Sequence, residues 1–172
     1  MTAIFPGFEE TRLLLVPVLL LLNNLVMTQH ENIVGWREWL SLPELGIEWI
    51  KAKVDTGART SALHAFELDE YMESGLKMVS FSIHPLQKRE DIVHSCVAAV
   101  VDERVVSDSG GHREKRYVIS TPVRLGEHEW PIEVTLTNRD SMLFRMLLGR
   151  TAMAGRFLVQ PEASFLFGRP EL

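Results

Sequence analysis

The sequence predicts an all-β protein, and three observations support this. Short runs of apolar and β-branched residues recur along the chain, and stretches rich in turn-forming residues separate them. Of the 172 residues, 46% are hydrophobic and 24% charged, which is enough for one domain with a substantial core. Hardly any segment shows a helical period. Strands at this spacing favour a closed or sandwiched β-body.

Seven strands are expected, with turns between them. In chain order they cover residues 33–40, 47–54, 61–68, 77–84, 92–101, 116–121 and 132–136. Residues 41–46 form the first turn. In the second strand, Ile50, Ala52 and Val54 share one face, and Trp49 is expected to pack in the core from the other. Only residues 151–158 look helical, and Gly155 weakens that pattern.

Charge and cysteine content narrow the class of protein. A formal net charge of -5 argues against a protein that coats nucleic acid, because that function needs an overall basic surface. The single cysteine, Cys96, allows neither an internal disulfide nor a zinc site built from thiolates. We therefore expect a cytoplasmic protein in which Cys96 fills the core.

The N-terminal segment contains an unbroken apolar run at residues 13–22. This run is too short to span a bilayer, and the acidic residues before it do not fit a secretory signal. We expect residues 1–26 to be a poorly ordered extension or a mis-assigned start, with Met27 as the biological start. The domain would then be residues 27–172, with no membrane contact. A signal peptide or anchor remains the alternative.

A short motif follows the second predicted strand directly. Asp55, Thr56 and Gly57 place a carboxylate where backbone N–H groups and a hydroxyl can orient it, and glycine permits close approach of the backbone. By itself this tripeptide also fits an ordinary Asx turn at the end of a strand.

A second motif lies further along the chain, where Met146, Leu147 and Leu148 precede Gly149 and Arg150. Together with the Asp-Thr-Gly run, it resembles the retropepsin family of aspartic proteases. The resemblance implies a closed β-barrel with one short C-terminal helix, in which the Leu-Gly-Arg strand passes beneath a catalytic Asp55. It also implies that Thr56 and Gly57 support that residue, and that residues 106–119 form the flap hairpin.

The chain is also similar to a bacterial family labelled as ATP-dependent zinc proteases, which is retropepsin-like despite its label. The similarity lies in residues 34–38 (Val-Gly-Trp-Arg-Glu), in residues 51–65 around Asp55, and in the Leu-Gly-Arg strand. It implies an aspartic endopeptidase. Related genes accompany glutamate ligases of the ATP-grasp type, which extend a ribosomal protein with glutamates. A polyglutamate-bearing protein is therefore the substrate that the resemblance implies.

Aspartic proteolysis needs two carboxylates that share one proton, and one Asp-Thr-Gly run supplies only one of them. A twofold homodimer that brings two copies of Asp55 together is the economical completion. A rival lies within the chain, because Asp108-Ser109-Gly110 is the serine variant of the same tripeptide. Charged residues follow it where an apolar strand is needed, so a hairpin tip explains it better.

The resemblance also implies a set of residues that contact the substrate. They are Ala58, Arg59, Arg150, Gly110 and Gly111. Retroviral members carry an acidic residue where this chain has Arg59, so we expect Arg59 and Arg150 to bind a substrate carboxylate. Basic residues on the presumed flap strengthen this preference for acidic peptides, namely Arg113, Lys115 and Arg116. The alternative is ordinary solvated surface charge.

Zinc and ATP are suggested only by the family label. The chain has no His-Glu-x-x-His motif and no phosphate-binding loop, so no metal and no cofactor are expected. A zinc site that combines Asp55 with His64 and another histidine is left open. The function predicted from the sequence is thus peptide-bond hydrolysis. The alternatives are a noncatalytic peptide-binding module and a zinc-dependent peptidase.

Overall fold

The structure is a computed structural model that describes residues 32–170, except for residues 88, 108–110, 112 and 139–142. Residues Val34–Leu172 form one compact unit. The expectations for residues 1–26 and for the Asp108-Ser109-Gly110 run lie outside the described residues. No helix within the described part is both long and apolar enough to cross a membrane.

The described residues are mostly β-strand, as the sequence predicted. The elements are β1 (Ile33–Gly35), β2 (Arg37–Leu42), η1 (Pro43–Leu45), β3 (Ile47–Asp55), β4 (Ser61–His64), β5 (Phe66–Glu73), β6 (Leu76–Ile83), β7 (His94–Ser107), β8 (Arg113–Leu125), β9 (His128–Thr137), β10 (Met146–Gly149), α2 (Arg150–Met153) and β11 (Leu158–Gln160). The helix is shorter than the predicted 151–158, because Ala154 leaves the helical conformation and Gly155 has a φ of 73°.

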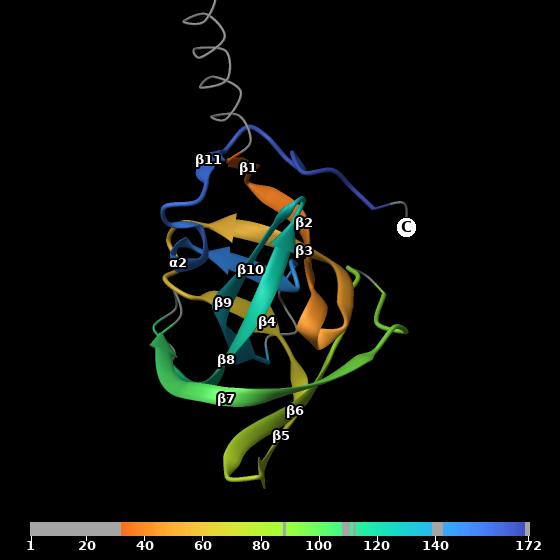
Figure 1. The fold of residues 1–172 in the computed structure, drawn as a ribbon, viewed down its shortest axis with the longest axis vertical. Coiled ribbons are helices and arrows are strands. Elements are labelled where there is room, and N and C mark those ends of the chain that lie inside the picture. Colours follow the sequence, from red (N-terminus) through yellow and green to blue (C-terminus); the bar gives the residue numbers. More distant parts are fainter. Residues whose placement is uncertain (1–31, 88, 108–110, 112, 139–142, 171–172) are drawn as a thin grey trace, which may run out of the picture. The chain divides into compact units, whose positions relative to one another are not determined.

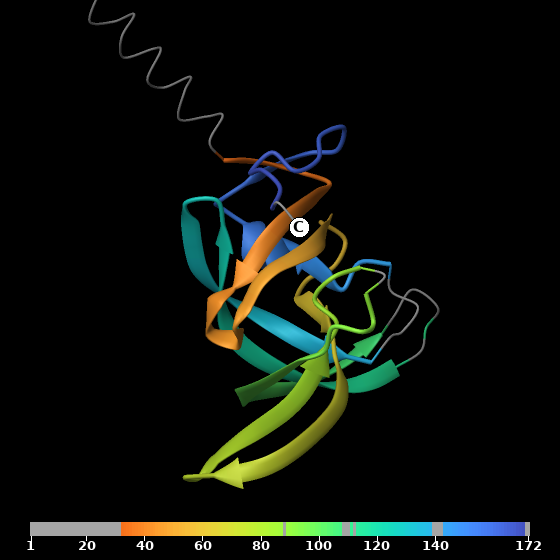
Figure 2. The same ribbon diagram turned by 90° about the vertical axis from the view of Figure 1, so that its right-hand side faces the viewer.

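Nine strands form one sheet in the order β2-β3-β10-β4-β9-β8-β7-β6-β5 (Figure 1). Strand β2 also pairs with β8, through Ser41 and Arg124. Strands β1 and β11 form a separate two-stranded sheet. Figures 1 and 2 show the β5–β6 hairpin extending beyond the other strands of this unit. The strands around β10 therefore surround most of the core, and the hairpin lies at the edge of the sheet.

Two predicted strands are each divided in the structure. The segment 33–40 breaks at Trp36, whose N–H donates to the carbonyl of Ala163 (2.9 Å) and whose carbonyl accepts from Val54 (2.9 Å). The segment 61–68 breaks at Ala65, whose N–H donates to Thr137 (3.0 Å). In both cases a backbone hydrogen bond to a residue distant in sequence interrupts the regular pairing expected for one continuous strand. No local sequence pattern indicates such a bond.

Strand β3 confirms one sequence expectation and corrects another. Ile50, Ala52 and Val54 are buried as predicted. Trp49 is 38% exposed and does not pack in the core. The pairing of β2 with β3 shifts register between Leu40 and Leu42, so strict alternation fails near the start of β3. Trp49 lies on the face opposite Ile50, Ala52 and Val54, together with Lys51 and Lys53, and the core does not cover that face.

Cys96 fills the core, as the sequence predicted, and is only 4% exposed. Its thiol lies 3.6 Å from the carbonyl oxygen of Leu45. Burial raises the pKa of the thiol to about 11, because the thiolate is poorly solvated there. The side chain therefore behaves as a small apolar group.

A buried carboxylate explains much of the 34–38 run. Glu38 is fully buried on β2, and it accepts hydrogen bonds from the N–H groups of Gly35 (2.7 Å), Leu166 (3.1 Å) and Phe167 (3.4 Å). Two of these donors belong to the C-terminal segment, which therefore lies against β1 and β2. Such bonds are what a buried charge needs to offset its loss of hydration.

The neighbouring residues of the run bind the same C-terminal segment. A Cβ added to Gly35 would lie 2.4 Å from the carbonyl oxygen of Ala163, so only glycine fits. The guanidinium of Arg37 lies 4.4 Å from the ring centroid of Trp36 and 4.8 Å from that of Phe165. Arg37 therefore lies between the rings of β1–β2 and the C-terminal segment.

An ionic network joins the β5–β6 hairpin to β7 and β8. Lys77 bonds to Glu103 (2.6 Å) and Glu70 (3.3 Å), Lys115 pairs with Glu103, and the hydroxyl of Tyr117 donates to Glu70 (2.7 Å). The hydrogen bonds from Lys115 and Lys77 lower the pKa of Glu103 from 4.5 to about 2.

This shift predicts a pH dependence of stability. The pKa of Glu103 is lower in the folded chain, so its ionised form stabilises the fold above pH 4.5, and this contribution is lost as pH falls toward 2. We expect the Tm of the wild type to fall more steeply across this window than that of Glu103→Gln. Glu73→Gln, at an exposed position on β5, is the control. Equal slopes for the wild type and Glu103→Gln would contradict the prediction.

Candidate functional site

Asp55 is the last residue of β3, and its side chain is half-buried. The N–H groups of Gly57 and Ala58 donate to its Oδ1 atom at 3.0 and 3.1 Å. In the part of the chain that the structure describes, no hydrogen bond to the other oxygen, Oδ2, is found. One carboxylate oxygen is thus fixed by the turn, as in an Asx turn. Oδ2 is left to interact with other molecules.

Strand β10 lies directly beside this residue. It pairs in parallel with β3, so that Gly149 is the partner of Asp55, and it pairs antiparallel with β4, so that Leu147 is the partner of Ala62. The Leu-Gly-Arg strand therefore passes between the strands on either side of the Asp55 loop. This is the arrangement that the sequence predicted.

Gly149 permits an unusually close contact at this point. An added Cβ would lie 2.6 Å from the carbonyl carbon of Thr60 and 2.8 Å from the nitrogen of Ser61, so any side chain would displace the backbone. The N–H of Gly149 donates to the buried hydroxyl oxygen of Ser61 at 3.1 Å. Ser61 lies within the 51–65 run, but no local pattern marks it as a supporting residue, because its partner is 88 residues away.

The first turn of α2 holds the loop that follows Asp55. The N–H of Arg150 donates to the carbonyl of Ala58 (2.9 Å), and the N–H and hydroxyl of Thr151 both donate to the carbonyl of Arg59 (3.1 and 2.8 Å). The Nη1 atom of Arg150 donates to the carbonyl of Gly57 at 3.0 Å and reaches that of Thr56 at 3.5 Å. Sequence reasoning missed Thr151, because its partner is 92 residues earlier.

The two arginines that were expected to bind substrate occupy different surroundings. Arg150 lies against the loop carbonyls described above. Arg59 is exposed and lies near Glu133, whose pKa is lowered by a hydrogen bond from Arg104 and, to a smaller extent, by the charge of Arg59. Both side chains are exposed, but only Arg150 bonds to the loop among the described contacts.

Strands β7 and β8 form a hairpin that contains the segment predicted as the flap. Their pairing runs from Val100 with Ile119 to Ser107 with Arg113, and Gly111 has a φ of 80°. Gly110 lies outside the described residues. Lys115 pairs with Glu103, and Arg116 bonds to Glu114 at 2.7 Å, so these two cations already have acidic partners.

The open zinc hypothesis fails on geometry. Asp55 pairs with Gly149 at one end of β10, whereas the N–H of His64 donates to the carbonyl of Arg145, just before the other end. Positions 145 and 149 are about 13 Å apart at the usual rise per strand residue. Across the described residues, no group of three or more His, Cys, Asp or Glu side chains could hold a metal ion. A site built on Asp55 and His64 does not fit.

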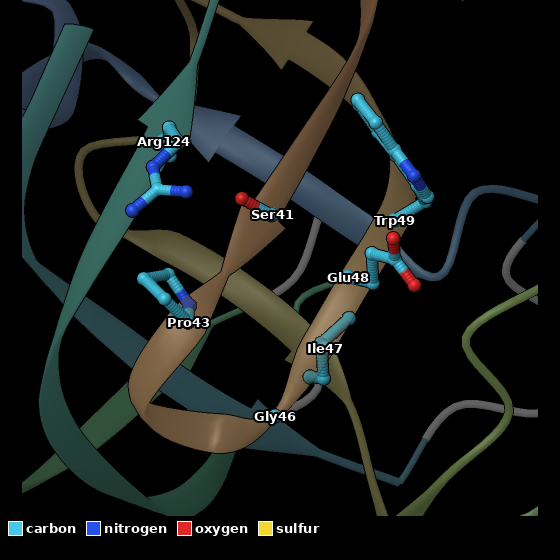
Figure 3. A pocket seen from close by; sticks show the side chains of 7 residues that line it. All are labelled: Ser41, Pro43, Gly46, Ile47, Glu48, Trp49 and Arg124. Atoms are coloured by element: carbon cyan, nitrogen blue, oxygen red, sulfur yellow. The ribbon is translucent and has the colours of Figure 1, made fainter. Parts of the chain in front are cut away.

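A pocket of about 400 Å³ lies at the turn between β2 and β3. In Figure 3, Ser41, Pro43 and Arg124 lie on one side of this turn, and Glu48 and Trp49 lie on the other. The pocket is at the opposite end of β3 from Asp55, about 26 Å away along the strand. It is therefore separate from the candidate site.

Comparison with known proteins identifies one family. Residues 33–170 match the RimB-like family, described as the retropepsin-like aspartic endopeptidase RimB. A solved structure of a protein of unknown function from Legionella pneumophila has a TM-score of 0.67 and 28% identity, and the match covers 79% of this chain and 98% of that one.

Curated relatives are longer proteins. The chain is 47% identical over 143 residues to a probable alpha-L-glutamate ligase of Shewanella halifaxensis. This match covers 83% of this chain and 31% of that relative. The chain is 51% identical over 136 residues to a probable alpha-L-glutamate ligase of Parasynechococcus marenigrum, covering 79% and 29%. The chain therefore spans about a third of the length of these relatives.

The contact at Gly149 predicts a folding defect. Gly149→Ala would force the backbone of Thr60 and Ser61 away from β10, so we expect a loss of about 1–3 kcal/mol in the free energy of unfolding. Gly57→Ala is the control, since its added Cβ would meet no backbone atom and only Asp55 Oδ1, at 3.2 Å, so we expect a smaller loss. Urea unfolding of both variants tests this. Equal stability of Gly149→Ala and the wild type would contradict it.

Proposed function

Because the chain belongs to the RimB-like family of retropepsin-like aspartic endopeptidases, we propose that it hydrolyses peptide bonds, with Asp55 activating the attacking water. The observation that carries this proposal is the setting of Asp55. Its carboxylate follows a buried strand, two backbone N–H groups hold one oxygen, and a close-packed strand lies beside it. A carboxylate fixed in this way has a defined direction for proton transfer.

The reaction that we propose needs two carboxylates with one proton between them. The ionised carboxylate takes a proton from water as the water oxygen attacks the scissile carbonyl carbon, and the protonated carboxyl gives its proton to the carbonyl oxygen. The tetrahedral intermediate then breaks its C–N bond. The leaving nitrogen receives the proton that the first carboxylate took from water, and the second carboxylate takes back a proton from a hydroxyl of the intermediate, which restores the starting state. We propose that the second carboxylate is Asp55 of a second copy, in a homodimer with a twofold axis at the site.

Supporting roles follow from this arrangement. We propose that Thr56 braces the two Asp55 loops and that Gly57 lets them approach each other. The single pair between Ser41 and Arg124 supports the further proposal that the strands from β2 to β8, in sheet order, close into a barrel around the core. Such closure would hold β3 and β10 rigidly under the loop.

The proposed substrate is an acidic peptide, in the simplest case a protein that carries several glutamates. Arg59 supports this, because it is exposed next to the Asp55 loop and a guanidinium can bind a carboxylate through two hydrogen bonds. Arg113, exposed on β8 next to the hairpin tip, is a second candidate. We propose a cytoplasmic location, since a chain with one cysteine needs no oxidising compartment.

The names of the relatives refer to ligation and not to hydrolysis. We propose that their ligase activity resides in the two thirds of their length that this chain does not match. The lack of a phosphate-binding loop motif in this sequence supports that division. Glutamate would then be the chemical link between the two activities.

Replacing the proposed catalytic carboxylate should abolish cleavage. We expect Asp55→Asn to lower kcat by about 10²–10⁴-fold on a glutamate-rich protein, because the amide cannot accept a proton from water. Asp69→Asn, at an exposed position of β5, is the matched control and should cleave normally. Both are assayed with and without a chelator. Wild-type protein that binds the peptide without cutting it would instead favour the binding module, and cleavage lost only with chelator would favour a metal enzyme.

The same variant tests the pairing of two Asp55 residues. Adding excess Asp55→Asn protein should lower the activity of each wild-type subunit, because mixed dimers have one carboxylate too few. Constant activity per wild-type subunit in a mixture shown to exchange subunits would exclude a shared site.

The acidic substrate predicts a selective effect of Arg59. We expect Arg59→Ala to lower kcat/KM by about tenfold for a glutamate-rich peptide and much less for a neutral one, because a charge-assisted hydrogen bond is lost. Arg89→Ala, which removes an exposed arginine bonded to Asp91, is the control. Unchanged selectivity in Arg59→Ala would remove Arg59 from substrate recognition.

A further inference from the structure

Each peptide group that donates to Asp55 has a second, opposite contact. The N–H of Ala58 belongs to the same planar peptide group as the carbonyl of Gly57, and the N–H of Gly57 belongs to the same group as the carbonyl of Thr56. The two N–H groups bond to Asp55 Oδ1. The two carbonyls face Nη1 of Arg150, at 3.0 and 3.5 Å.

We infer that Arg150 is a positioning residue for Asp55, whose guanidinium fixes and polarises the two peptide groups that hold the carboxylate, and that it does not bind the substrate. The inference rests on the proposed function. Because a trans peptide group is rigid, a donor that holds its oxygen also sets the direction of its N–H. Hydrogen bonds in a chain strengthen one another, so a cation at one end favours a carboxylate at the other.

The backbone at the start of α2 also bonds to the loop that follows Asp55. Helix α2 has no side-chain cap, and its first two N–H groups donate instead to the carbonyls of Ala58 and Arg59. The backbone at Arg150 is therefore anchored to the loop that its side chain orients. Thr151 adds a hydroxyl bond to the carbonyl of Arg59 at 2.8 Å. Four successive loop carbonyls, from Thr56 to Arg59, thus face Arg150 and Thr151.

The two exposed arginines differ in what holds them. Nη1 of Arg150 is engaged by the carbonyls of Thr56 and Gly57, whereas Arg59 makes no such contact among the described residues. The two roles predict different kinetics. A substrate-binding arginine affects KM and the choice between acidic and neutral peptides, whereas a positioning arginine affects kcat equally for both peptides.

The test compares Arg150→Met with Arg59→Ala on one glutamate-rich and one neutral peptide. We expect Arg150→Met to lower kcat about tenfold or more on both peptides with little change in KM, because a charge-assisted bond is lost. Thr151→Val should lower kcat about threefold, and Thr151→Ser should restore it, because only serine keeps the hydroxyl. Arg156→Met, just beyond α2, is the matched arginine control.

Three outcomes are distinguishable. If the wild type does not cleave, or if Asp55→Asn still cleaves, the proposed function fails. If both of those controls behave as expected but Arg150→Met raises KM only for the acidic peptide, the positioning role is overturned and Arg150 binds substrate. If Arg150→Met has lost its native circular dichroism spectrum, Arg150→Gln decides, since it removes the charge, and unchanged kcat on both peptides in this folded variant also overturns the inference.

Discussion

The close packing of Gly149 against the backbone of Thr60 and Ser61 is the constraint on which the candidate site depends. It lets β10 enter between β3 and β4 and brings the end of β10 level with Asp55. Because β10 is followed at once by α2, its position also decides where Arg150 and Thr151 meet the loop. A shift of β10 by one residue would turn each of its side chains to the opposite face of the sheet and would move these donors away from the loop carbonyls.

The site is made rigid mainly by backbone groups. Two N–H groups fix one oxygen of Asp55, and the carbonyls of the same loop are held by the start of α2. Once the strands are paired, backbone groups lose little further conformational entropy when they form these hydrogen bonds, whereas a long surface side chain loses much of its rotamer freedom. A catalytic carboxylate held in this way is ready before substrate arrives, which is the condition for efficient proton transfer.

Local sequence signals predicted the parts of the fold that depend on neighbouring residues. Alternation identified the buried face of β3 at Ile50, Ala52 and Val54, and the Asp-Thr-Gly and Leu-Gly-Arg motifs marked the two ends that meet at Asp55. The breaks at Trp36 and Ala65 and the exposure of Trp49 could not be predicted in this way. The two breaks arise from hydrogen bonds to distant residues, and Trp49 is exposed because no other part of the described chain covers its face of β3. The partner of Arg150 was missed for the same reason, because it is 93 residues away.

The burial of Glu38 has a consequence for the order in which the protein can be completed. Its donors at Leu166 and Phe167 leave the ribosome 128 and 129 residues after Glu38 itself. Until they arrive, β2 would hold a carboxylate without two of its hydrogen-bond donors, a state that disfavours burial of this strand. The N-terminal half of the domain is therefore expected to complete its packing only after residues 166 and 167 have left the ribosome.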